Sequence, residues 1–215
     1  MNTRKTEKVV NNHLFNKNIL ATAVAAVMFG GTGVALAAST DISSDTPVTG
    51  DLTTNYNVQD ANTLTITGGT STTSYLSSFN GTIDGETDVG KGGNVVIAGN
   101  LTMRGNIGST NTTGNFTLND GNTLVLQDSM TIFNTANITL SSNSILNFGN
   151  ATSGYNRDTA LTMNANITMA GNSTINIGNN TTLTGDVVGA SSGQGTVNII
   201  GNFTSGGNFG DNVVD

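Results

Sequence analysis

Residues 115–139 read NFTLNDGNTLVLQDSMTIFNTANIT, and their apolar side chains recur in pairs two positions apart. The pairs are Phe116/Leu118, Leu124/Leu126 and Met130/Ile132. Residues two apart share a face in an extended strand, and the Asn, Asp and Gly residues between the pairs favour turns. The stretch therefore predicts short, half-buried strands separated by polar corners.

A three-residue phrase, Asn followed by an apolar residue and Thr, recurs along the chain. It begins at Asn100, Asn115, Asn137, Asn166 and Asn202, at steps close to multiples of seven. If one strand and its corner take about seven residues, three of them make a coil of roughly 20 to 25 residues. We therefore predict an all-β chain that folds as a right-handed parallel β-helix, a solenoid of short strands.

Two other folds share parts of this pattern. A coiled coil also repeats every seven residues, but it needs apolar residues three and four apart among helix formers, and here they are two apart among Gly, Asn and Thr. An antiparallel β-sandwich has short strands and many turns and stays open as an alternative.

The pattern also predicts the limits of the solenoid, which we place at residues 64–215. Residues 38–63 are polar and are expected to form a linker or N-terminal cap. An irregular loop is expected at 70–93, where Ser, Thr and Gly dominate. A loop inserted into one coil is expected at 153–160, where the repeat is interrupted.

Composition and charge exclude several classes of protein. The chain of 215 residues has no Cys, which excludes a disulfide scaffold and a thiolate metal site. Of its seven Lys and Arg residues only Lys91, Arg104 and Arg157 lie beyond residue 37, against all but one of the fourteen Asp and Glu residues. So acidic a chain is not expected to bind nucleic acid.

Residues 1–37 have the layout of a secretory signal peptide. Four basic residues precede an apolar run at 19–36, and Ala35 and Ala37 supply the small residues of a cleavage site. We expect cleavage between Ala37 and Ala38, after recognition by the general secretion machinery. An uncleaved N-terminal anchor is the alternative, since about 20 apolar residues can span a bilayer.

Beyond the leader, the phrases GDVVG at 185–189, GTVNIIGN at 195–202 and the repeated Asn-Ile-Thr carry a resemblance. The chain resembles the N-terminal passenger of an autotransporter, and most of all the large surface antigens of rickettsiae and related Gram-negative bacteria. The resemblance implies a β-helical protein exported to the cell surface, outer membrane or extracellular space, where it adheres to host cells through a receptor. It brings no catalytic residues and no cofactor.

The same family carries a C-terminal barrel translocator, which the 215 residues do not contain. We therefore expect a fragment of a longer gene product or another exit route. A truncated or purely structural surface scaffold without a receptor is the alternative function.

Enzymatic function is not expected. Residues 189–193 read GASSG and match the pattern of a serine nucleophile elbow, but the only histidine, His13, lies in the leader. A β-helical carbohydrate-active enzyme is the less favoured alternative, because it needs clustered carboxylates with nearby cations and the acids here are scattered.

Two weak candidate sites remain. Asp84, Glu86 and Asp88 alternate as calcium ligands do, although no calcium-binding repeat surrounds them. In the inserted loop, Tyr155 and Arg157 are residue types favoured at contact hot spots. The predicted contact loop comprises Tyr155, Asn156, Arg157 and Asp158.

Overall fold

The computed structural model describes residues 39–49, 53–67, 77–86, 92–149 and 157–210, whose regular elements are all β-strands. The chain divides into two compact units, Met1–Ala35 and Leu36–Asp215, and the described residues all belong to the second. Every strand pair within them is parallel, which excludes the antiparallel sandwich. The fold is all-β, with parallel strands in stacked sheets, as in a solenoid.

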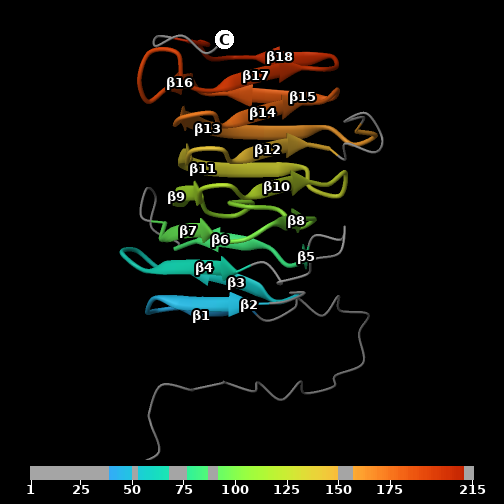
Figure 1. Cartoon of the computed structure of the whole chain (residues 1–215). Helices are drawn as coiled ribbons and strands as arrows, with labels where there is room; N and C mark the ends of the chain where they lie inside the picture. Colours follow the sequence, from blue (N-terminus) through green and yellow to red (C-terminus); the bar gives the residue numbers. More distant parts are fainter. Residues whose placement is uncertain (1–38, 50–52, 68–76, 87–91, 150–156, 211–215) are drawn as a thin grey trace, which may run out of the picture. The chain divides into compact units, whose positions relative to one another are not determined.

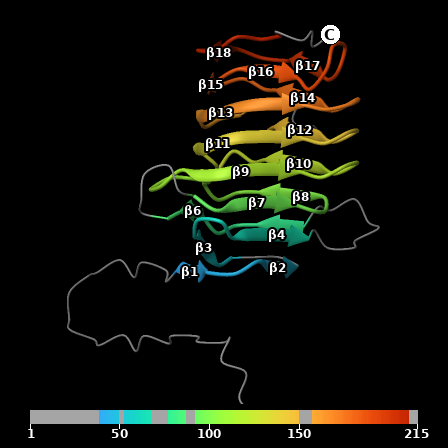
Figure 2. The same cartoon turned by 90° about the vertical axis from the view of Figure 1, so that its left-hand side faces the viewer.

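The strands lie on three faces of this stack and follow one another in sequence order from β1 to β18 (Figures 1 and 2). The first face contains β1 (Ser39–Ile42), β3 (Asn55–Val58), β6 (Ile83–Gly85), the first parts of β11 (Ile132–Leu140) and β13 (Leu161–Met169), β15 (Thr181–Thr184) and β18 (Phe203–Ser205). The second face contains β2 (Thr46–Thr49), β4 (Thr63–Thr67), β7 (Asn94–Ile97), β9 (Thr113–Leu118), the last parts of β11 and β13, and β16 (Val187–Gly189). The third face contains β5 (Ser77–Phe79), β8 (Leu101–Met103), β10 (Thr123–Leu126), β12 (Ile145–Phe148), β14 (Thr174–Ile177) and β17 (Thr196–Ile199).

The spacing between hydrogen-bonded neighbours in adjacent coils agrees with the predicted repeat. Asn94 and Asn115 bond across 21 residues of sequence, and Asn115 and Asn137 across 22. One coil is longer, with 29 residues between Asn147 and Asn176, and the stretch 153–160, where a loop is predicted, falls within it. At Asn115, Asn137 and Asn166 the recurring phrase thus marks equivalent positions in successive coils. Asn100 instead precedes β8 on the third face, and Asn202 precedes β18 on the first face.

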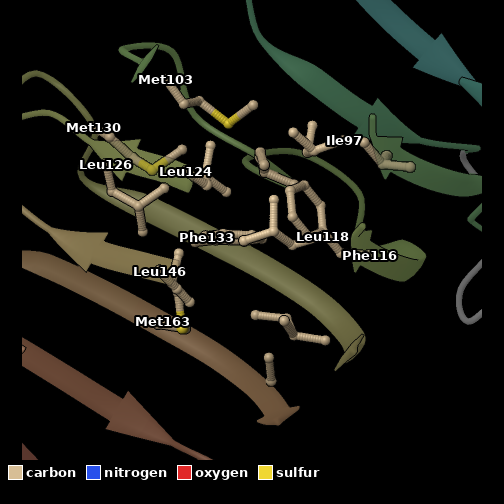
Figure 3. Close-up of a cluster of buried hydrophobic side chains, with 14 of the residues drawn as sticks. Ile97, Met103, Phe116, Leu118, Leu124, Leu126, Met130, Phe133, Leu146 and Met163 are labelled. Atoms are coloured by element: carbon tan, nitrogen blue, oxygen red, sulfur yellow. The ribbon is translucent and has the colours of Figure 1, made fainter. Parts of the chain in front are cut away.

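The core consists of apolar side chains stacked on their counterparts in the next coil. On the second face Val95, Phe116, Ile138 and Ile167 are paired in successive strands, and each is at most 1% exposed. Phe116 also meets Phe133 edge to face, with ring centroids 5.0 Å apart. Figure 3 shows these two rings among Leu and Met side chains that reach inward from neighbouring coils. The alternation of inward and outward residues therefore produces a continuous apolar core.

Asparagine side chains form a hydrogen-bonded row on the outside of each face, and we call these the Asn rows. On the second face, Asn137 donates to Asn115 and Asn115 donates to Asn94, both at 3.1 Å. On the third face, Asn198 donates to Asn176 at 2.8 Å and Asn176 to Asn147 at 2.7 Å. On the first face, Asn164 donates to Asn134 at 2.5 Å. Asn side chains, of which Asn115 and Asn137 belong to the recurring phrase, therefore connect the coils.

Two predicted boundaries need correction. The stack begins before residue 64, because β1, β2 and β3 lie within the stretch 38–63 that was expected to be a linker or cap. The stretch 70–93, expected to be an irregular loop, contains β5 and β6. β5 has Phe79 and β6 has Ile83 as its one large apolar side chain. Neither strand therefore contains the pair of apolar residues, two positions apart, from which the other strands are predicted. Of the expected inserted loop 153–160, the described residues 157–160 contain no strand.

No helix in the described ranges is long and apolar enough to cross a membrane. The predicted leader and its cleavage residues Ala35, Ala37 and Ala38 lie outside those ranges. The signal-peptide interpretation therefore stays a prediction.

Candidate functional site

A groove in the first face, among the first coils of the stack, is the candidate functional site, and we call it the polar groove. Its volume is about 430 Å³, within the range of about 300–1,000 Å³ found for small-molecule sites. Strands β1, β3 and β6 contribute its floor, and the segment 109–111 of the next coil contributes a wall. The polar groove is lined by Ser39, Asn55, Tyr56, Asn57, Thr82, Asp84, Ser109, Thr110 and Asn111.

The floor is built on a row of three polar residues held in register. β1 pairs Asp41 with Asn57, and β6 pairs Asp84 with the same Asn57. Because side chains alternate along a strand, Tyr56 and Val58 point into the core while Asn57 points outward. The row is thus a direct consequence of the parallel register.

In the described part of the chain, the side chain of Asn57, at the centre of this row, has a hydrogen-bond partner for its Nδ2 but not for its Oδ1. Its Nδ2 donates to Asp41 Oδ1 at 3.1 Å. Its Oδ1 is buried and has no hydrogen-bond partner among the described residues. Leaving such an acceptor unpaired costs about 1–3 kcal/mol, so this part of the face is not optimised for stability alone.

The wall of the polar groove is a bulge in the coil above β6. Gly108 N donates to Ile83 O at 2.7 Å, and Gly85 N donates to Asn111 O at 2.9 Å. The upper coil has more residues between these two bonds than β6 has, so its chain bulges outward at 109–110. Gly108 permits the bend, since its φ is +62° and a Cβ there would lie 2.1 Å from Asn134 O.

Asp84 holds this bulge in place. Its carboxylate accepts the backbone N–H of Thr110 at 2.8 Å and the hydroxyl of Ser109 at 3.2 Å. Lower in the groove, Asn55 Oδ1 accepts the N–H of Thr82 at 2.8 Å. Floor and wall are therefore fixed by bonds between coils, which preorganises the polar groove.

The electrostatic character of the polar groove follows from its lining. Hydroxyl and amide groups predominate, Asp84 is the only acid, and Lys and Arg are absent from the lining residues. With no cation to pair with, an anionic ligand is disfavoured there.

Of the predicted calcium ligands, Asp84 and Glu86 accept hydrogen bonds from different segments of the chain. Asp84 is occupied by Ser109 and Thr110, whereas Glu86 Oε2 accepts the N–H of Asp60 at 3.2 Å. Asp88 lies outside the described residues. Within those residues, no group of three or more His, Cys, Asp or Glu side chains could hold a metal ion.

The four residues of the predicted contact loop differ in where the structure places them. Tyr155 and Asn156 lie outside the described residues, and Asp158 is exposed. Arg157 is 1% exposed and turns inward, so its side chain is not available to a partner at the surface. Its Nη1 donates to Leu126 O at 2.8 Å and its Nη2 to Met130 O at 2.5 Å. The residue therefore binds the carbonyl groups of the preceding coil.

Burial also changes the titration of Arg157. Removal of the guanidinium from water lowers the pKa of Arg157, and the negative charge of Asp128 opposes this shift. The partner carbonyls account for the position of this cation, because a buried guanidinium needs acceptors for its N–H groups.

The GASSG stretch has no catalytic arrangement in the described residues. Ser191 and Ser192 are exposed after β16, and Gly193 has a φ of +72°, as a tight turn requires. His13 lies outside the described residues. The stretch is a turn between β16 and β17.

Sequence reasoning missed the polar groove. Asp84 was identified only as an alternating acid, and Asn57 was placed in a linker. The detectable signal was the apolar pair Tyr56/Val58, which marks β3 as a strand and Asn57 as outward-facing. The bulge at 109–110 has no comparable signal, because it depends on bonds to another coil.

No protein-family model, curated protein or solved structure shows a significant match to the chain.

Proposed function

We propose that this protein is an exported bacterial cell-surface protein, an autotransporter passenger segment that serves host-cell adhesion or surface presentation. Its stack is then a right-handed parallel β-helix. The observation that carries the proposal is the series of parallel coils whose outer positions bear Thr and Asn in strands such as β13, β14 and β15. A stack of this kind presents grooves and loops at fixed places on a self-supporting scaffold.

The way the stack is stabilised supports export. Each coil contacts mainly its neighbours, so folding can begin at one place and propagate coil by coil. Neither Cys nor a metal cluster of the described residues is needed to hold the coils together. A chain of this kind can fold progressively after it has crossed a membrane unfolded.

Export is tested by processing and fractionation. The full chain with a C-terminal epitope tag is expressed in a Gram-negative bacterium, and the recovered protein is subjected to N-terminal sequencing. We expect a mature N-terminus at Ala38 and protein outside the cytoplasm. In the Ala37→Asp variant the cleavage site loses its small residue, so the precursor should accumulate. Uncleaved wild-type protein retained in the cytoplasm would contradict the proposal.

Adhesion is tested separately from export. Purified, fluorescently labelled protein is titrated onto cultured host cells, with unlabelled protein as competitor. Saturable binding that the competitor removes is the expected result for an adhesin. Binding that rises linearly with concentration and resists competition would contradict adhesion and would favour the alternative, a surface scaffold without a receptor.

A further inference from the structure

We infer that the polar groove binds a neutral oligosaccharide. The inference gives a ligand class to the adhesion proposed above and rests on that proposal for its biological setting. The binding chemistry is argued from the groove alone, and its test needs no cells.

The lining matches the chemistry of a sugar. Each lining residue carries a hydroxyl, amide or carboxyl group, so hydrogen-bond donors and acceptors are both present in the lining. Each sugar hydroxyl can likewise donate one hydrogen bond and accept others. The Cβ and methyl groups of Thr82 and Thr110 supply small apolar surfaces against which the C–H faces of a sugar ring can pack.

The polar groups are held in position before a ligand arrives. Asn57 is tied to Asp41, Asp84 to the bulge, and Asn55 to the backbone of Thr82. Immobilising a flexible side chain on binding reduces the affinity, because conformational freedom is lost. Where the order already exists, weak polar contacts with hydroxyl groups add up to measurable affinity.

Other ligand classes fit less well. Phosphorylated, sulfated or sialylated ligands would place a negative charge beside Asp84 with no cation in the lining. An apolar ligand would cover hydroxyl and amide groups without bonding them, which is unfavourable for each group left unpaired. A divalent cation would find Asp41 and Asp84 on opposite sides of Asn57 rather than converging.

The test is a glycan array carrying neutral, sialylated and sulfated oligosaccharides, probed with the full chain. The best-retained oligosaccharide is then titrated by isothermal titration calorimetry, with and without a chelator. We expect retention of neutral oligosaccharides, with an affinity that the chelator does not change. Retention of anionic glycans only, no retention of any glycan, or loss of binding with the chelator would overturn the inference.

Two variants locate the binding to the polar groove. Thr110→Trp fills the groove from its exposed wall, and because only the backbone N–H of Thr110 bonds to Asp84, the fold should be retained. It should abolish binding. Asn57→Ala removes the amide that bonds Asp41 across the floor, and it should weaken binding about tenfold, the effect of losing roughly 1.4 kcal/mol.

Asn198→Ala is the matched control. Asn198 also lies at the centre of a strand and donates one side-chain bond, to Asn176, but on the third face. This variant should bind as the wild type does. Unchanged affinity in a folded Thr110→Trp protein would show that the sugar binds elsewhere and would overturn the inference, whereas export of the same chain would be unaffected.

Discussion

The guanidinium of Arg157 lies 2.8 Å from the carbonyl oxygen of Leu126, across 31 residues of sequence. Leu126 ends β10, and its carbonyl belongs to a corner where the chain leaves the third face. The same guanidinium also donates to the carbonyl oxygen of Met130. One side chain from the following coil therefore bonds two carbonyl groups in this corner. The coil with the inserted loop is thereby joined to its predecessor.

Replacing Arg157 should therefore destabilise the stack. We expect Arg157→Ala to lower the free energy of unfolding by about 3 kcal/mol, since two buried carbonyls would lose charged donors. Urea unfolding followed by circular dichroism measures the effect. Arg157→Lys should recover only part of it, because an ammonium group cannot reproduce the planar fork.

The exposed neighbour provides the control for this variant. Asp158→Ala should change the free energy of unfolding by less than about 0.5 kcal/mol, as is usual for surface substitutions. Equal effects of Arg157→Ala and Asp158→Ala would show that the guanidinium contributes nothing to the corner.

Phe116 should be among the most sensitive core positions. It is fully buried, stacked between Val95 and Ile138, and packed edge to face on Phe133. Phe116→Ala should cost about 3–5 kcal/mol, the range for truncated aromatic core residues. Phe209, which is 37% exposed, is the comparison, and Phe209→Ala should cost much less. A comparable loss at both positions in urea titrations would argue against a continuous core.

The Asn rows should contribute modest but additive stability. Asn115 accepts from Asn137 and donates to Asn94, so Asn115→Ala removes two side-chain bonds. Exposed amide bonds contribute about 0.5–1.5 kcal/mol each, and we expect a total loss of about 1–2 kcal/mol. Asn172→Ala, in an exposed turn, should have a smaller effect. The midpoint of thermal unfolding distinguishes the two variants, and equal midpoints would show that the row is not stabilising.

Gly105 should tolerate no side chain. A Cβ there would lie 1.6 Å from Gly81 O, and a Cβ on Gly81 would lie 1.9 Å from Thr54 O. Successive coils thus approach closely through a column of backbone atoms, which cannot yield as a flexible side chain can. Gly105→Ala should destabilise by several kcal/mol or prevent folding. Gly206→Ala, whose Cβ would meet only Thr184 Cγ2 at 3.0 Å, should fold normally and give the same circular dichroism spectrum as the wild type.

Much of the fold could be predicted from apolar spacing, because inward positions alternate strictly in β4, β7 and β14. The spacing misleads at β11, where Met130 and Ile132 were expected to share the inward face. Instead Met130 is buried in the corner before β11, where the alternation is interrupted, so that Phe133 is buried and Ile132 is half-buried. β11 then spans two faces, with a shift of register between Asn134 and Asn137. A strand that turns a corner without a Gly or Pro leaves no local signal.

The candidate site was less predictable for a related reason. The polar groove depends on which coil lies above which, and that register decides that Asp84 meets Thr110 across 26 residues. Polar residues on a strand and in a loop look alike in sequence, so Asn57 and Asp84 carried no indication that they share a floor. The sequence predicts Arg157 to be a contact residue of a surface loop, but its inward direction is set by carbonyls of another coil.

Stability should also fall towards β17, the last strand of the third face. β14 has strand neighbours on both sides, whereas β17 pairs with β14 alone among the described residues, and its Ile199 is 57% exposed. Backbone amides that lose few contacts on opening exchange their hydrogens through local rather than global unfolding. Hydrogen exchange followed by mass spectrometry should therefore show fast exchange for peptides covering 196–199 and slow exchange for peptides covering 137–140 and 166–169. Substituting Ile199→Thr should leave the slow peptides unchanged, because the coils below keep all their contacts. Equal protection throughout would mean that the stack opens as one cooperative unit, and nearest-neighbour stacking would then be the wrong description of its stability.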